Sequence, residues 1–185
     1  MTGRSARCSL ITAFAILGCY GAAGAFAATE TQNVCATAGV SNSMVKKIFG
    51  TTATIDPAGV SRVDRCPIQA GTGSKPATDC REGSKTCTSV IVELQPASNF
   101  QTDITANVSA LDLNGRASKT SVSGAGPGAV LMRSTNYGGQ SNPLVLFQAG
   151  SYTVIVEGPY GGVAETPAIY LKWEALARAI YTRLG

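Results

Sequence analysis

Four of the six cysteines of this 185-residue chain lie between residues 35 and 87, and their pairing constrains the fold more than any other sequence feature. They are Cys35, Cys66, Cys80 and Cys87. An even number of cysteines in an exported chain predicts disulfides, here two bonds with three possible pairings. We favour Cys35–Cys66 with Cys80–Cys87, because the second pair brackets a polar, turn-like segment that closes easily into a short loop. A metal site is the alternative, but no pair has C-x-x-C spacing and the chain has no histidine.

The first 27 residues have the three parts of a cleavable signal segment. Arg4 and Arg7 supply the positive charge, and an apolar stretch follows over residues 10–17. Ala25-Phe26-Ala27 then provides the small residues that a signal peptidase accepts. We therefore predict a signal peptide over residues 1–27.

Cleavage after this segment leaves one domain, residues 28–185, in the periplasm or outside the cell. It also removes Cys8 and Cys19, which leaves the four cysteines above. An alternative is lipidation at Cys19, because Ile16-Leu17-Gly18-Cys19 resembles a bacterial lipobox. An uncleaved anchor would need about 20 predominantly apolar residues, more than this segment offers, and no membrane span is predicted in the mature chain.

The charge and composition of the chain exclude some classes of function. Without Arg4 and Arg7, thirteen of the fifteen basic residues remain against eleven acidic ones, and no basic run occurs. A nucleic acid is therefore not an expected partner, because nucleic-acid binding needs clustered positive charge. The absence of histidine removes the commonest general base and the middle member of a Ser-His-Asp triad.

Three segments have the apolar repeat of an amphipathic helix. Ser41 or Ser43 begins the first, and Gly50 ends it. Thr166 caps the last, whose Trp173 is assigned to the core. The three helices are predicted over residues 40–50, over residues 98–112, and from Pro167 towards the C-terminus.

Strands are predicted from β-branched, apolar runs that turn residues separate. They cover residues 88–94, 128–134, 143–148 and 151–157, and the last two form a tight hairpin at Ala149-Gly150. Residues 51–86 are expected to be irregular, with an exposed loop over residues 70–76, and to be tied down by the two disulfides. The predicted fold class is α+β: an antiparallel sheet of about four strands with N-terminal, central and C-terminal helices packed on one face.

Four residues in loops are candidates for contact with a partner. Tyr137 and Tyr160 each lie in a glycine-rich turn, where an exposed aromatic ring suits recognition of a protein or sugar. Arg81 and Lys85 lie in the loop that Cys80 and Cys87 bracket. The glycine run 124–128 is interpreted as a turn or bulge, because no helix or nearby lysine follows it to build a phosphate cradle.

No catalytic, cofactor-binding or metal-binding residue is predicted. The carboxylates are scattered without paired or calcium-loop spacing, and no serine lies in a G-x-S-x-G or S-x-x-K motif. A hydrolase without histidine would need two carboxylates to converge in three dimensions, and the sequence leaves that open.

The order of motifs carries a resemblance. An early cysteine precedes a short helix that ends in glycine, a second cysteine precedes a strand, and a central helix precedes a glycine-rich strand start, an apolar hairpin and a terminal helix. The corresponding pieces are Cys35 with 45–50, Cys66, 100–111, Gly124-Ala125-Gly126-Pro127-Gly128-Ala129, 144–156 and 171–184. This order resembles a group of uncharacterised bacterial envelope proteins, many of them lipoproteins, that share a domain of unknown function. The resemblance implies an α+β fold and an envelope or binding role, and it carries no catalytic residue across. Cys80, Cys87 and the lack of a clear lipobox depart from it.

The expected function is therefore an exported, non-enzymatic binding protein of the cell envelope, whose partner is an envelope component or a secreted protein. The alternative is a secreted or periplasmic enzyme inhibitor that inserts the Cys80–Cys87 loop into its target. A histidine-free hydrolase is the third hypothesis.

Overall fold

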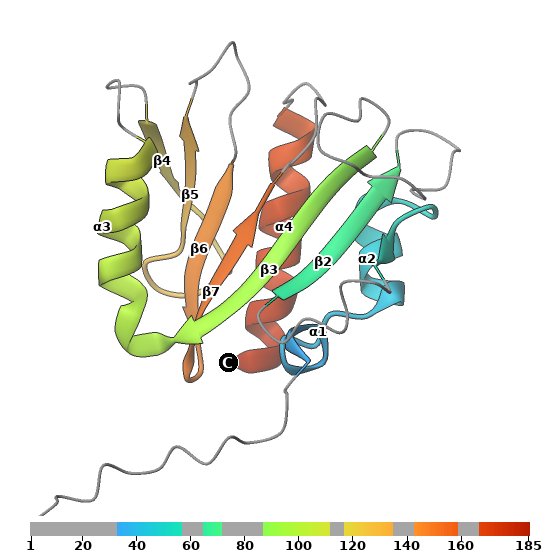
Figure 1. Ribbon diagram of the computed structural model, residues 1–185, viewed down its shortest axis with the longest axis horizontal. Helices are drawn as coiled ribbons and strands as arrows, with labels where there is room; N and C mark the ends of the chain where they lie inside the picture. Colours follow the sequence, from blue (N-terminus) through green and yellow to red (C-terminus); the bar gives the residue numbers. More distant parts are fainter. Residues whose placement is uncertain (1–32, 57–64, 72–86, 112–116, 135–142, 159–166) are drawn as a thin grey trace, which may run out of the picture. The chain divides into compact units, whose positions relative to one another are not determined.

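The computed structural model describes residues 33–56, 65–71, 87–111, 117–134, 143–158 and 167–185 (Figure 1). All of them belong to one compact unit, Thr31–Gly185. The predicted signal segment, residues 1–27, lies outside the described residues. Across the described ranges, no helix is both long and apolar enough to cross a membrane.

The described part of the chain contains a seven-stranded sheet in which all neighbouring strands are antiparallel (Figure 1). The strand order is β1-β2-β3-β7-β6-β5-β4. The α+β class is therefore confirmed, but the expected count of about four strands is wrong. The strands are β1 Thr54–Ile55, β2 Arg65–Gly71, β3 Cys87–Pro96, β4 Ala117–Ser121, β5 Val130–Ser134, β6 Leu144–Ala149 and β7 Tyr152–Glu157.

Strand β2 corrects the expectation that residues 51–86 are irregular. Cys66, Ile68 and Ala70 are buried at alternate positions, which is the period of a strand, but Pro67 between them obscures the pattern. The Pro67 carbonyl accepts a hydrogen bond from the Asp56 N–H at 2.9 Å, on the side of β1. Because N–H and C=O of one strand residue point to the same side, the missing N–H of Pro67 also faces β1, and the ladder to β3 stays intact.

Strand β4 was missed for a different reason. Its sequence, ASKTS, has no large apolar residue, and Ser118, Lys119, Thr120 and Ser121 are exposed at the edge of the sheet. A polar edge strand with a lysine resists pairing with other chains, but it produces no hydrophobic signal in the sequence.

The predicted helices are confirmed close to their expected bounds. They are α2 Asn42–Phe49, α3 Phe100–Leu111 and α4 Pro167–Leu184; a short α1, Val34–Thr37, and a 3₁₀ turn, Ala97–Asn99, were not anticipated. Ser41 accepts a hydrogen bond from the Met44 N–H at 3.3 Å and so begins α2, and Gly50 ends it with a φ of 114°. Trp173 of α4 is fully buried, as expected.

The helices cover both faces of the sheet, which corrects the prediction that all of them pack on one face. Val145 and Phe147 of β6 pack in the core that α1, α2 and α4 share, while Leu144 and Leu146 pack with Phe100 of α3 in a second cluster. Adjacent strand residues point to opposite faces, so α3 lies on the face opposite to α4. The sequences of β5, β6 and β7 indicate this arrangement, because they are nearly continuous apolar runs. In a strand that is buried on one face alone, apolar and polar residues alternate.

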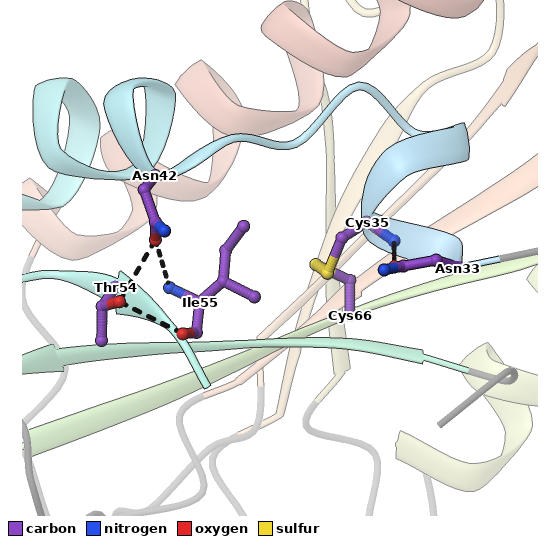
Figure 2. The surroundings of a disulfide bond; sticks show 6 residues. All are labelled: Asn33, Cys35, Asn42, Thr54, Ile55 and Cys66. Atoms are coloured by element: carbon purple, nitrogen blue, oxygen red, sulfur yellow. Dashed lines mark hydrogen bonds between the residues drawn. A yellow bond between two sulfur atoms is a disulfide. The ribbon is translucent and has the colours of Figure 1, made fainter. Parts of the chain in front are cut away.

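A disulfide joins Cys35 of α1 to Cys66 of β2, as predicted (Figure 2). It is the one disulfide among the described residues, where the sequence predicted two in the whole chain. Cys80, half of the second predicted pair, lies outside the described residues, and Cys87 is the first residue of β3. The Cys80–Cys87 bond therefore stays a prediction.

Candidate binding groove between helices α2 and α4

A surface groove of about 560 Å³ separates α2 from α4. Its volume falls within the range of small-molecule sites, roughly 300–1,000 Å³. Half-buried Met44 and Ile48 of α2 face Ala175 and Ala179 of α4, so that the walls are apolar. The remaining lining residues are polar or charged: Ser41, Ser43, Lys47, Thr182 and Arg183.

Two tethers hold the α2 side of the groove on the sheet. The Asn42 side-chain oxygen accepts hydrogen bonds from the Ile55 N–H at 2.8 Å and from the Thr54 hydroxyl at 3.2 Å, and so ties the first turn of α2 to β1 (Figure 2). The Cys35–Cys66 disulfide ties the preceding helix to β2. Both residues that Asn42 holds are themselves paired with β2, so the first turn of α2 has a fixed place over the sheet.

Helix α4 forms the other wall, because one of its faces packs on the sheet while another lines the groove. Trp173, Leu176 and Ile180 are fully buried against the sheet. Ala175, Ala179 and Thr182 follow one another at spacings of four and three residues, so they share a different face. Because these side chains are small, α4 is narrow on this face and leaves a hollow beside Met44 and Ile48.

The two charged side chains in the described lining of the groove are both positive. Lys47 and Arg183 line it, and Lys46 is exposed on the last turn of α2. The sequences of α2 and α4 contain one acidic residue, Glu174, whose carboxylate lies 3.3 Å from the Arg178 guanidinium. Arg178 also donates a hydrogen bond to the Ser123 carbonyl at 3.0 Å. Glu174, the acidic residue of these two helices, is therefore paired with Arg178, whereas Lys47 and Arg183 place positive charge along the rim of the groove.

The backbone of Gly39, just before α2, supports the aliphatic part of the Arg183 side chain. Its φ is 66°, and a Cβ at this position would lie 3.1 Å from Cγ and 3.2 Å from Cβ of Arg183. The aliphatic part of Arg183 therefore lies against the Gly39 backbone while the side chain as a whole remains exposed. A side chain that is supported in this way loses less conformational entropy when it binds.

The residues that the sequence singled out for partner contact are not among those that the structure describes. Tyr137, Tyr160, Arg81 and Lys85 are all outside the described residues, so the predictions that rest on them, including the inhibitor loop, stay predictions. The groove itself was not predicted. Met44, Lys47 and Ile48 are neighbours on α2, where Met44 and Ile48 also pack against the main core, and only the position of α4 turns this side of α2 into the wall of a groove.

The glycine run 124–128, which the sequence predicted to be a turn or bulge, forms a turn. It joins β4 to β5, and Gly124, Gly126 and Gly128 have φ values of 79°, 96° and 74°. A Cβ on Gly126 would lie 2.5 Å from Cε2 of Tyr181, so this turn needs glycine to approach α4.

The described residues provide little for a catalytic hypothesis. Among them, no group of three or more histidine, cysteine or acidic side chains could hold a metal ion. Burial raises the pKa of the Asp103 carboxyl above its ordinary value, and its Oδ2 has no hydrogen-bond partner among the described residues. Asp103 belongs to α3, however, on the face of the sheet opposite to the groove. A carboxyl with a raised pKa is a feature of many catalytic sites, but that of the half-buried Asp103 stands apart from the groove.

No protein-family model, curated protein or solved structure matches this chain. The groove must therefore be interpreted from its own chemistry.

Proposed function

We propose that this chain is an exported, non-enzymatic binding protein of the bacterial cell envelope and that the groove between α2 and α4 is its binding surface. The observation that carries the proposal is the apolar wall pair, Met44 and Ile48 against Ala175 and Ala179, at the protein surface. A concave surface with apolar walls and a few polar groups around them is a common form of binding site.

The construction of the groove also supports this function. Both walls are helices, and the α2 wall is held by the Cys35–Cys66 disulfide and by the two hydrogen bonds that Asn42 accepts. A binding surface on rigid elements loses little entropy when a partner docks, which favours affinity. A disulfide is also a tether suited to an oxidising compartment such as the periplasm.

Site-specific photo-crosslinking in the intact cell envelope tests the proposal. A photoreactive phenylalanine analogue replaces Ala179 in the groove, and a matched variant carries it at Gln148, an exposed residue of β6 outside the groove. We expect a discrete cross-linked product from position 179 and none from position 148. Equal products from both positions, or none from position 179, would contradict a binding role for the groove.

The same preparation tests export. Intact-mass spectrometry should find a mature chain that begins at Ala28, after cleavage at Ala27. A chain that begins with a lipid-modified Cys19 would instead place the protein on a membrane, and a chain that retains Met1 to Ala27 would overturn the export prediction.

A further inference from the structure

We infer that the groove between α2 and α4 takes an acidic, amphipathic α-helix about two turns long from a partner protein. The inference rests on the proposed function, because it names the partner of the same site. Three features of the groove support the inference: its helical walls offer few backbone hydrogen-bond partners, it is about two helical turns long, and the charged side chains that line it are positive.

The walls favour an occupant whose backbone N–H and C=O groups form hydrogen bonds with one another. Within α2 and α4 most backbone N–H and C=O groups are used inside the helix, so the groove has no free strand edge to pair with an extended peptide. An extended segment would lose hydrogen bonds to water without replacing them, which is unfavourable next to apolar walls. A helix keeps its backbone hydrogen bonds internal and can present only side chains to the groove.

The length and shape of the walls suit two helical turns. From Ala175 to Thr182 the α4 wall covers eight residues, which span about 10 Å along the helix axis. The small side chains of this wall let another helix approach closely. Met44 opposite is flexible and adapts to different apolar side chains. Two or three apolar side chains at spacings of three and four residues would fill the groove.

The rim selects for negative charge. Lys47 and Arg183 line the groove, and its described lining includes no acidic side chain. The helix dipoles add little to this charge, because the positive end of α2, near Ser41 and Ser43, and the negative end of α4, near Thr182, line the same groove. An acidic helix therefore gains from the rim. A second copy of this chain does not suit the site, because a symmetric contact through the groove would bring the same cations together.

A pair of synthetic peptides tests the inference on the purified, oxidised mature chain. One is a 15-residue amphipathic helix with leucine on one face and glutamate on the other, and its counterpart has lysine at every glutamate position. Binding is measured by fluorescence anisotropy and mapped by amide chemical shifts. We expect the acidic peptide to bind saturably, at least about tenfold more tightly than the basic one, and to shift Ala175, Ala179 and Thr182.

Charge reversal sharpens the test. The double variant Lys47→Glu with Arg183→Glu should weaken the acidic peptide at least about tenfold, whereas Lys119→Glu, on the exposed edge strand β4, should leave affinity unchanged. The conservative pair Lys47→Arg with Arg183→Lys should retain binding, and circular dichroism checks that every variant folds. Equal binding of both peptides, no binding of the acidic peptide, or shifts that map away from the groove would overturn the inference.

Two further outcomes separate this inference from the proposed function. Cross-linking at position 179 that persists in the charge-reversed variant would keep the groove as a binding site but overturn an acidic partner. Binding to phosphatidylglycerol vesicles that depends on Lys47 and Arg183, without binding of the acidic peptide, would assign the rim to a membrane surface and overturn the inference.

Discussion

The two ends of the sheet are stabilised by different means. The half formed by β1, β2 and β3, which we call the tethered half, packs one face on the helices and carries polar, half-buried side chains on the other. On this polar face the Arg65 Nη2 lies 3.9 Å from the Glu93 Oε1. The Gln69 side-chain amide also donates a hydrogen bond to the Asp56 carboxylate at 2.9 Å. The half formed by β4 to β7, the sandwiched half, packs β5, β6 and β7 between the main core and the α3 cluster.

This difference explains where the covalent bond lies. A strand covered on both faces gains free energy from apolar burial on both, about 25 cal/mol for each Å² removed from water. The tethered half has one such face, and its outer strand β1 is only two residues long. The Cys35–Cys66 disulfide and the Asn42 hydrogen bonds act on this half, which also carries the α2 wall of the groove. Binding would then depend most on the half whose packing is weaker.

The largest expected effect is in the sandwiched half. Phe147 of β6 is fully buried in the main core, so Phe147→Ala should lower the free energy of unfolding by about 3–5 kcal/mol, through lost burial and the cavity that remains. Urea denaturation measures the change. The neighbouring Gln148 is exposed, and Gln148→Ala should change stability by less than about 0.5 kcal/mol. Similar losses for both variants would show that apolar packing is not what stabilises this half.

Removal of the disulfide should have the next largest effect and act on the tethered half. The bond closes a loop over a sequence separation of 31 residues, for which chain entropy predicts a contribution of roughly 3.5 kcal/mol. The double variant Cys35→Ala with Cys66→Ala should therefore lose about that much. Hydrogen exchange should accelerate first in α1, α2, β1 and β2. Uniform acceleration that includes β6 and β7 would show that the two halves unfold as one unit and would break the comparison.

A pair of glycine variants should have the smallest effects and separate backbone strain from close packing. Gly50, after α2 in the tethered half, has a φ of 114°, and a Cβ added there would meet nothing within 4 Å, whereas Gly126 has a φ of 96° and the Tyr181 ring at 2.5 Å from such a Cβ. We expect Gly50→Ala to cost about 1–3 kcal/mol from backbone strain alone, and Gly126→Ala to cost more, because the clash with the Tyr181 ring adds to its strain. Thermal unfolding compares them. If Gly126→Ala costs no more than Gly50→Ala, then α4 does not press closely on the β4–β5 turn.

Local sequence signals predicted much of the fold. The Ser41 cap, the Gly50 stop and the apolar repeat place α2, and Pro167 with the stripe from Trp173 to Ile180 places α4, because each signal acts within one or two turns. The apolar runs of β3, β6 and β7 were equally legible. Strand β2 was obscured by Pro67, whose effect depends on which neighbour its missing N–H faces, and polar β4 has no apolar signal at all.

What the sequence alone determined is the helices α2, α3 and α4, the apolar strands β3, β5, β6 and β7 and the α+β class, since these follow from residue types and spacing along the chain. The Cys35–Cys66 bond was one of three possible pairings, and the structure decided it. The strand order, the placement of α3 opposite α4 and the groove required the tertiary structure. Met44, Lys47 and Ile48 lie more than 125 residues before Ala175, Ala179 and Arg183, and no local rule relates their side chains. Only packing on a common sheet places an apolar wall of one helix beside the small residues of the other, with Lys47 and Arg183 at the rim.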